Sequence, residues 1–174
     1  MKLSARNQLA GTVTEVKLGN VMASVKVTHR AAITTSAEVG SLLRVIEGYE
    51  GHPITLAALR LLPHVFVRPG ELRHAEWADF DLDAALWIIP AGKTKMRKPH
   101  HVPLSRQAVD LFREVQAITG PNGFVFPSIR TRARPMSENT MNQAFRRMGY
   151  ANDDVTAHGL RTTGSTLLIP WRAT

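Results

Sequence analysis

The sequence predicts a mainly α-helical α+β fold with a small antiparallel sheet, preceded by a β-hairpin. Residues 11–28 alternate apolar and polar side chains around a Gly-Asn turn, a pattern typical of a hairpin. After about residue 30 the apolar residues recur at helical spacing instead. Two short apolar segments, residues 85–90 and 100–105, flank a basic stretch and are candidates for strands. The change of pattern predicts two domains, residues 1–29 and residues 30–174.

The first three helices are expected between residues 36 and 73. Ser36 is a suitable N-cap for the first helix, whose apolar residues share one face. The second follows Pro53, with Thr55 as its expected cap. A third, short helix is expected to begin near Pro69, because proline is favoured in the first turn of a helix.

The remaining helices are expected in the last 70 or so residues. Ser105 caps a clearly amphipathic helix that ends before Gly120. Another helix is expected over about residues 138–148. The last begins near Thr156, which is a good N-cap.

Composition limits the function classes. The chain of 174 residues has no cysteine, which excludes a disulfide framework and a thiolate metal site. Its 44% apolar content is normal for a packed core. The net charge is +8, and in residues 92–174 Lys and Arg outnumber Asp and Glu by 13 to 5. Several basic runs in one half of the chain favour a nucleic-acid partner.

Membrane insertion and secretion are not expected. The longest apolar stretch, residues 56–67, is too short to span a bilayer and includes Arg60 and Pro63. The first 11 residues lack the apolar centre of a signal peptide. We therefore expect a soluble cytoplasmic protein.

Four basic residues are the candidates for chemistry. Arg68 ends an apolar run and precedes Pro-Gly-Glu, and Lys95 lies between the two expected strands. His158 and Arg161 are three residues apart and share one helix face. Arginine forks bind phosphate oxygens in pairs, whereas lysine and histidine transfer protons. Each feature alone is equally consistent with a solvated surface, but together they could hold one phosphate without a metal ion.

The order of these residues resembles a known family. Four segments carry the resemblance: "HRAAITTSAEVGSLLRVIEGYEGHP", "FVRPGELRHAEWADFDLDAALWIIPAGKTKMRKPHHVPLSRQA", "FVFPSIRTRARPMSENTMNQAFRRMGY" and "VTAHGLR". They are similar to the catalytic domain of tyrosine recombinases, specifically prophage integrases, over roughly residues 29–168. The resemblance implies a mainly α fold with a three-stranded sheet, one hairpin of which projects a lysine into the active site.

The resemblance also implies roles for individual residues. Arg68 matches the first catalytic arginine of the family, and Glu71 matches its acidic support. Lys95 matches the hairpin lysine, with Lys93 as the alternative if the hairpin register is shifted. The histidine and second arginine of the His-x-x-Arg motif are His158 and Arg161.

The implied reaction is DNA strand transesterification without metal, ATP or another cofactor. In it a tyrosine attacks the phosphate, the arginines stabilise the transition state, and the lysine protonates the leaving 5′-oxygen. The expected partner is double-stranded DNA, and self-association on DNA is left open. The residues expected to bind DNA are Lys93, Arg97, Lys98, Arg130, Arg132 and Arg134.

The nucleophile is the part of the family pattern that the sequence does not show. The family places its tyrosine some tens of residues beyond the His-x-x-Arg helix, and Arg161 is the thirteenth residue from the last. The two tyrosines, Tyr49 and Tyr150, both precede that helix. We therefore expect a catalytic domain that is truncated before its nucleophile and is inactive alone.

The first 28 residues resemble a different protein family. "SARNQLAGTVTEVKLGNVMASVKV" is similar to the first half of a Mop-like (TOBE) molybdate-binding domain. That resemblance places Ser4 and Arg6 in an oxyanion-binding stretch and gives an alternative function, molybdate or oxyanion binding. A lone hairpin is marginally stable in water. The competing interpretation is therefore that this segment is a vestigial or loosely docked hairpin that binds no oxyanion.

A metal-dependent nuclease is the weakest alternative. His100 and His101 are adjacent in an expected strand, where neighbouring side chains point to opposite faces and rarely share one ion. Asp79 and Asp81 would be the acids of such a site. No metal ligand is expected.

Overall fold

The computed structural model describes residues 12–18, 23–28, 33, 35–94 and 96–168. The helices are α1 (Ser36–Glu47), α2 (Pro53–Val65), α3 (Pro69–Arg73), α4 (Arg106–Thr119), α5 (Thr140–Arg147) and α6 (Gly159–Leu168), with 3-10 turns η1 (Trp77–Asp79) and η2 (Ala91–Lys93). The strands are β1 (Thr12–Leu18), β2 (Ala23–Thr28), β3 (Phe80–Asp81), β4 (Leu86–Ile89), β5 (His100–Pro103), β6 (Pro127–Ser128) and β7 (Thr131–Pro135). This mainly helical α+β architecture confirms the predicted fold class.

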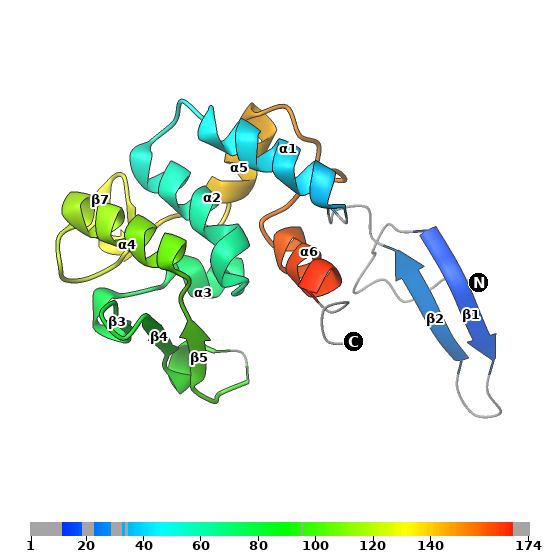
Figure 1. Cartoon of the computed structure of the whole chain (residues 1–174), viewed down its shortest axis with the longest axis horizontal. Helices are drawn as coiled ribbons and strands as arrows, with labels where there is room; N and C mark the ends of the chain where they lie inside the picture. Colours follow the sequence, from blue (N-terminus) through cyan, green and yellow to red (C-terminus); the bar gives the residue numbers. More distant parts are fainter. Residues whose placement is uncertain (1–11, 19–22, 29–32, 34, 95, 169–174) are drawn as a thin grey trace.

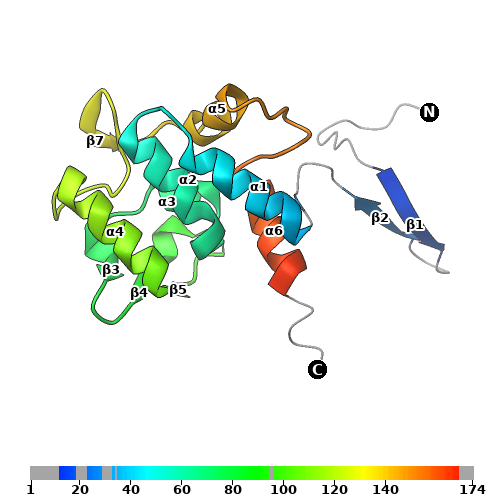
Figure 2. The same cartoon turned by 45° about the horizontal axis from the view of Figure 1, so that its top comes forward.

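The predicted N-terminal hairpin is present. β1 and β2 pair antiparallel from Thr12 opposite Thr28 to Leu18 opposite Ala23, with an irregularity after Val13. The Gly-Asn turn that the sequence suggested lies outside the described residues. The hairpin lies to one side of the helical body (Figures 1 and 2).

Two helix starts differ from the prediction by one to three residues. α1 is capped by Thr35 rather than Ser36, because the Thr35 side chain and the Glu38 carboxylate form a capping box. α2 begins at Pro53 and is capped by His52, whose Nδ1 accepts a hydrogen bond from the Ile54 N–H. Thr55 is therefore buried within the first turn of α2 instead of capping it.

α2 is the centre of the helical body. It contacts α1, α3, α4, α5 and α6, which surround it in Figures 1 and 2. Ala58, Leu59, Leu61 and Leu62 are all fully or almost fully buried, so this helix is apolar on most of its circumference. Because α2 is fixed on all sides, the loops at its two ends are held in defined positions.

The three-stranded sheet packs on α4 through aromatic rings. β3, β4 and β5 are antiparallel in that order, which confirms the two predicted strands and the three-stranded sheet that the resemblance implies. The rings of Phe80 and Trp87 stack at 4.9 Å, and Phe112 of α4 lies 4.7 Å from Phe80. This cluster fixes the sheet, and with it the loop that joins β4 to β5.

A second small hairpin, β6–β7, was not predicted. It pairs Ser128 with Thr131 and Pro127 with Pro135. Residues 131–134 are exposed on both faces of β7, so the alternating pattern that identifies a strand is missing there. The sequence therefore indicates only a basic run in this segment, whereas the structure shows a defined hairpin.

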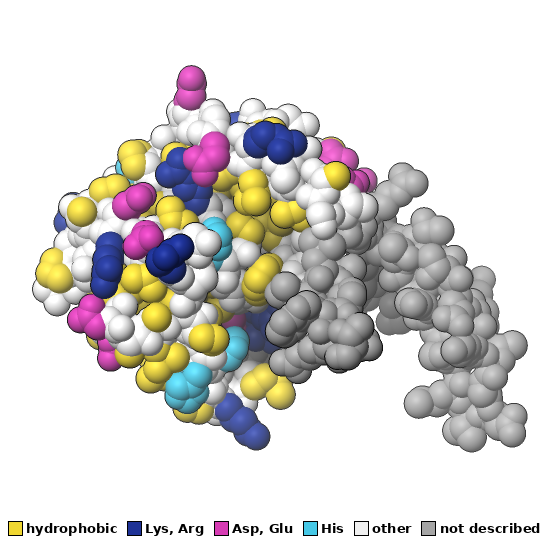
Figure 3. Space-filling view, viewed as in Figure 1, with side chains coloured by type: hydrophobic (Ala, Val, Ile, Leu, Met, Phe, Trp, Pro, Cys, Tyr) yellow, Lys and Arg dark blue, Asp and Glu magenta, His cyan; other side chains and the backbone are white. Residues whose placement is uncertain are grey.

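The charge is unevenly distributed over the surface. On the face shown in Figure 3, Lys and Arg side chains are interspersed with Asp and Glu, so the positive surplus of the chain does not gather there. Among the described residues, no helix is both long and apolar enough to cross a membrane.

Candidate active site

Arg68 is held in place by Glu71. Arg68 is the N-cap of α3, and its backbone N–H and its Nη1 donate to the two carboxylate oxygens of Glu71 at 2.9 and 2.8 Å. The Glu71 side chain is 4% exposed and that of Arg68 is 34% exposed. The carboxylate therefore fixes one edge of the guanidinium, and the other edge is left to face solvent.

The exposed edge of Arg68 faces a cavity of about 480 Å³. Residues of four regions surround it: the α2–α3 junction, the end of η2, the start of α5 and the residue before α6. The lining includes Arg68, Glu71, Lys93, Glu138, Asn142 and His158. The structure thus brings the predicted Arg68, Glu71, Lys93 and His158 together, although up to 90 residues separate them in the sequence.

Lys93, the alternative hairpin lysine, is paired with acids. Its Nζ lies 2.7 Å from the Asp79 carboxylate and 3.0 Å from that of Glu76. Burial lowers the pKa of Lys93, but the hydrogen bonds and charges of Asp79 and Glu76 outweigh this and leave the pKa above its ordinary value. Lys93 therefore stays protonated and anchors the β4–β5 loop to η1. Lys95, the preferred candidate, lies outside the described residues.

His158 and Arg161 are placed differently. His158 is exposed and lines the cavity, and its backbone carbonyl accepts the Arg161 N–H at 3.2 Å. Arg161 does not line the cavity, and its Nη1 is buried without a hydrogen-bond partner among the described residues. The Thr156 hydroxyl accepts from the Gly159 N–H, as predicted for the start of this helix.

Asn142 is a site residue that the sequence analysis missed. It lines the cavity from α5, and its side-chain oxygen accepts the Ala157 N–H at 2.9 Å, one residue before His158. Arg146, one turn further on, donates to the carbonyls of Asn142 and Val155. α5 thereby holds the segment that leads into His158. No spacing rule connects Asn142 with a residue fifteen positions later, so only the structure could reveal it.

The residues predicted to bind DNA lie on two loops. Arg97 and Lys98 are exposed in the β4–β5 loop, where the buried Thr94 hydroxyl donates to the Lys98 carbonyl at 2.8 Å. Arg97 has a positive φ of 51°, which marks a tight turn at the tip of this loop.

The three arginines of the β6–β7 hairpin differ in their hydrogen bonds. Arg130 and Arg134 are exposed, and their guanidinium groups have no hydrogen-bond partner among the described residues. The guanidinium of Arg132 donates to the carbonyls of Thr119 and Ile118 at the end of α4. Arg132 therefore holds the hairpin against α4.

Neither tyrosine lines the Arg68 cavity. Tyr49 lines a separate cavity at the other end of α2. Tyr150 packs against the core after α5, where burial, followed by the nearby Asp154 charge, raises the pKa of its hydroxyl. Both tyrosines are among the described residues, so the sequence places no tyrosine at this cavity.

The residues of the metal-nuclease alternative do not form a metal site. Asp79 is paired with Lys93, and His100 and His101 are both exposed on β5. Within the described part of the chain there is no group of three or more His, Asp or Glu side chains that could hold a metal ion.

Comparison with known proteins identifies relatives over most of the chain. A family model described as the phage integrase family matches residues 32–170. The putative protein IntB of Escherichia coli (strain K12) is 34% identical over 166 residues, which cover 88% of this chain and 42% of that protein. The integrase of Enterobacteria phage P4 is 34% identical over 175 residues, covering 93% of this chain and 40% of that protein. The chain thus spans about two fifths of these relatives.

Solved structures share the fold. The Tn1549 transposon integrase, solved in complex with a circular intermediate DNA, has a TM-score of 0.68 and 18% identity, and the match covers 84% of this chain and 56% of that one. The λ integrase (75–356) dimer bound to a COC′ core site has a TM-score of 0.62 and 21% identity, with 83% and 52% covered.

The N-terminal segment gains no support as a molybdate-binding unit. Ser4 and Arg6 lie outside the described residues. The match with the phage P4 integrase covers 93% of the chain, more than residues 32–174 alone can supply, so it extends upstream of residue 32. The phage integrase family model matches residues 32–170, which are most of the chain. The chain therefore belongs to the phage integrase family.

Proposed function

We propose that this chain binds duplex DNA and supplies the phosphate-binding part of a strand-exchange active site. The observation that carries the proposal is the cavity in which Arg68 and His158 meet, with Glu71 fixing the guanidinium. A preorganised guanidinium presents paired donors to two oxygens of one phosphodiester. Relatives of the phage integrase family support DNA as the substrate.

In this proposal the cavity holds the phosphodiester that is exchanged. Arg68 binds the non-bridging oxygens and stabilises the charge of the transition state. Arg161 does not line the cavity, so its unpartnered Nη1 must turn toward the phosphate for this arginine to bind a second oxygen. His158 moves a proton at the phosphate, and Lys95 protonates the 5′-oxygen as its bond to phosphorus breaks. The new phosphate ester forms to a tyrosine oxygen supplied from outside these residues as the 5′-oxygen leaves. One phosphate ester bond therefore forms for each one that breaks, and the exchange needs no ATP.

Asn142 has two parts in this site. Its side-chain oxygen is occupied by the Ala157 N–H, which positions the segment before His158. Its amide NH₂ has no partner among the described residues and can donate to a phosphate oxygen in the cavity.

Covalent attack is not expected of these residues alone. The nucleophile of the reaction is a tyrosine, and Tyr49 and Tyr150 are both placed away from the cavity. The remaining groups stabilise charge and move protons but cannot form a phosphotyrosyl bond. We therefore propose phosphodiester binding without covalent linkage, with residues 30–174 as the binding domain and residues 1–29 as a separate hairpin.

The DNA path is proposed to follow the basic loops beside the cavity. Arg97 and Lys98 at the tip of the β4–β5 loop, with Arg130 and Arg134 on the β6–β7 hairpin, offer exposed charge for backbone phosphates. Arg132 contributes by fixing its hairpin. Two of the solved relatives are in complexes with DNA.

The test measures fluorescence anisotropy of a labelled duplex. Wild-type affinity is expected to fall by one to three orders of magnitude between about 50 and 200 mM salt. Arg68→Gln is expected to weaken binding about tenfold. Arg106→Gln, which removes an exposed charge at the start of α4, is the control and changes affinity less than about twofold. A duplex affinity that does not change with salt concentration would contradict the proposal.

A second measurement addresses the chemistry. A suicide duplex with a nick near the scissile phosphate traps a covalent protein–DNA adduct where a nucleophile is present. We expect no adduct with the 174-residue chain. An adduct that persists on a denaturing gel would overturn the proposal that these residues bind without covalent linkage.

A further inference from the structure

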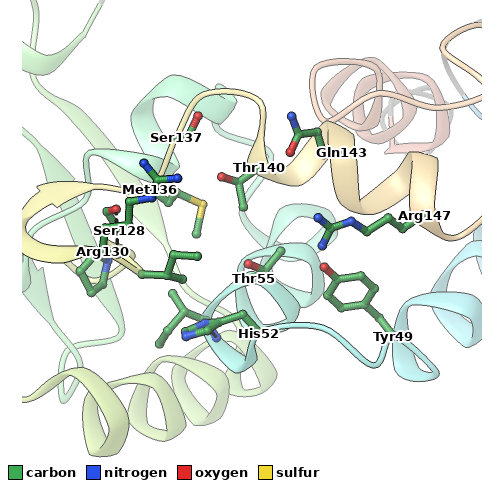
Figure 4. A pocket seen from close by; sticks show the side chains of 13 residues that line it. Tyr49, His52, Thr55, Ser128, Arg130, Met136, Ser137, Thr140, Gln143 and Arg147 are labelled. Carbon is green, nitrogen blue, oxygen red and sulfur yellow. Dashed lines mark hydrogen bonds between the residues drawn. The ribbon is translucent and has the colours of Figure 1, made fainter.

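A second cavity, of about 510 Å³, lies at the N-terminal end of α2. It is enclosed by the α1–α2 loop, the β6–β7 hairpin and the outer face of α5 (Figure 4). The residues that line it include Tyr49, Thr55, Arg130, Gln143 and Arg147. None of the residues that line it lines the Arg68 cavity, so the two cavities are separate.

The charge of this cavity is positive. Arg130 and Arg147 line it, and no Asp or Glu does. Both arginines are exposed, and neither guanidinium has an ion pair or hydrogen bond within the described part of the chain. Most arginines elsewhere in this body do have partners, as Arg68 and Arg132 show. Two unpaired guanidinium groups around one cavity favour an anionic ligand.

Thr55 is a second, independent sign of a ligand. Its side chain belongs to a residue that is 5% exposed, yet its hydroxyl has no hydrogen-bond partner among the described residues. Figure 4 shows it directed into the cavity. The Thr55 oxygen is not among the fully buried atoms without a partner in the described part of the chain, so it is open to the cavity. A ligand oxygen that enters the cavity can therefore accept a hydrogen bond from this hydroxyl.

The start of α2 adds to the positive potential without offering free N–H groups. The Ile54 N–H donates to the His52 ring, and the Thr55 N–H donates to the His52 carbonyl. The helix dipole still places partial positive charge at this end. Direct contacts to a ligand must therefore come from side chains.

The Tyr49 ring forms one wall of the cavity because residue 51 is glycine. A Cβ on Gly51 would overlap the ring atoms of Tyr49. The Tyr49 hydroxyl and the Arg147 guanidinium are directed toward the same part of the cavity as Thr55, and Arg130 approaches from the hairpin (Figure 4). The donors of Tyr49, Thr55 and Arg147 thus face one part of the cavity, and Arg130 lies across it on the hairpin side.

We infer that this cavity is a second phosphate-binding site, in which Arg147, Thr55 and Tyr49 donate to the oxygens of one phosphate group and Arg130, across the cavity, adds positive potential. Guanidinium and hydroxyl donors with no acid among them match phosphate chemistry. The phosphate comes either from the DNA backbone or from a free nucleotide, and both present the same oxygens. The inference does not depend on the proposed function, because it concerns a different cavity.

The first experiment titrates the ¹⁵N-labelled full chain with inorganic phosphate, using chloride at matched ionic strength as the reference. Saturable shifts are expected at the amides of His52, Ile54 and Thr55 and of residues 140–147. Thr55→Val, which removes only the hydroxyl, and Arg147→Gln are expected to weaken phosphate binding about fivefold or more. Arg106→Gln, outside both cavities, is the matched charge control and changes binding less than about twofold.

The outcomes against the inference are equally specific. Shifts of the same size with chloride, or wild-type phosphate affinity in both Thr55→Val and Arg147→Gln, would overturn it. Arg147 is exposed, so its substitution leaves the core intact and keeps the test valid even if Thr55→Val does not fold.

Titration with duplex DNA distinguishes the two sources of phosphate. If the ligand is the DNA backbone, Arg147→Gln lowers duplex affinity and reduces the salt dependence by about one phosphate contact. If the ligand is a free nucleotide, duplex affinity is unchanged while adenosine monophosphate reproduces the shifts at Thr55. Arg68→Gln should weaken duplex binding and leave those shifts intact, which keeps a failure of the proposed function distinct from a failure of this inference.

Discussion

The two ends of α2 present arginines to their cavities in different ways. At the C-terminal end, Arg68 is fixed by two hydrogen bonds to the buried Glu71 carboxylate. At the N-terminal end, Arg130 and Arg147 are exposed and have no acidic partner among the described residues. A fixed guanidinium presents donors at one geometry, which suits a reacting phosphate, whereas a mobile one adapts to a ligand that is only bound. The difference predicts that the first cavity tolerates less change than the second.

The largest effect is expected from Glu71→Ala. The substitution leaves the Arg68 guanidinium and backbone N–H without their partner in a mostly buried position. We expect the free energy of unfolding to fall by about 2–3 kcal/mol, measured by urea denaturation. Glu47→Gln, which breaks an exposed ion pair with Arg60, is the control and should change it by less than about 0.5 kcal/mol. Equal losses in the two variants would show that Glu71 does not fix Arg68.

Lysine substitutions test fixed against adaptable geometry directly. Arg68→Lys keeps the charge but removes the fork that Glu71 aligns, and duplex affinity is expected to fall about tenfold. Arg147→Lys keeps a charge that adapts to its ligand, and a change of about twofold is expected. Both are measured by anisotropy at one salt concentration. Similar losses at the two positions would contradict the distinction between the cavities.

α5 separates the two cavities and allows the next comparison. Asn142 faces the Arg68 cavity and Gln143 faces the second one. Asn142→Asp keeps the oxygen that accepts the Ala157 N–H and adds a negative charge where the phosphate binds. We expect duplex affinity to fall about fivefold for Asn142→Asp and about twofold for Gln143→Glu. The reverse order would indicate that the second cavity is the main DNA contact.

The Arg68 cavity was largely predictable because its signals are local. The Arg68–Glu71 pair lies within four residues at a helix start, and His158 with Arg161 lies within one helical turn. Resemblance to integrases then joined these pieces across the chain. Asn142 could not be identified from the sequence, because its hydrogen bond with Ala157 joins two segments that are not related by helical or strand periodicity.

The second cavity was not predictable for the same physical reason. It forms only when the loop before α2, the short β6–β7 hairpin and α5 meet, and each segment alone looks like ordinary surface. The sequence predicts Thr55 as a helix cap because threonine favours that position. Pro53 in the first turn and the His52 ring moved the helix start three residues earlier, which buried Thr55.

A pH-dependent effect is expected at Lys93, the lysine that Asp79 and Glu76 hold beside the first cavity. Its pKa is above the ordinary 10.5, so the folded state binds this proton more tightly than the unfolded state does. The stabilisation is complete below that ordinary value and is lost as the pH rises through the folded-state pKa. Lys93→Met should therefore lower the free energy of unfolding by about 1 kcal/mol near pH 8.

The same variant is to be compared with the wild type by urea denaturation at several pH values. The difference in unfolding free energy should shrink above pH 10.5. Every other side chain is the same in both proteins, so the difference between the two isolates Lys93. A difference that stays constant with pH would mean that the ammonium does not hold the β4–β5 loop. In that case Arg68 would be the one cation of this cavity fixed by acids, among those that the structure describes.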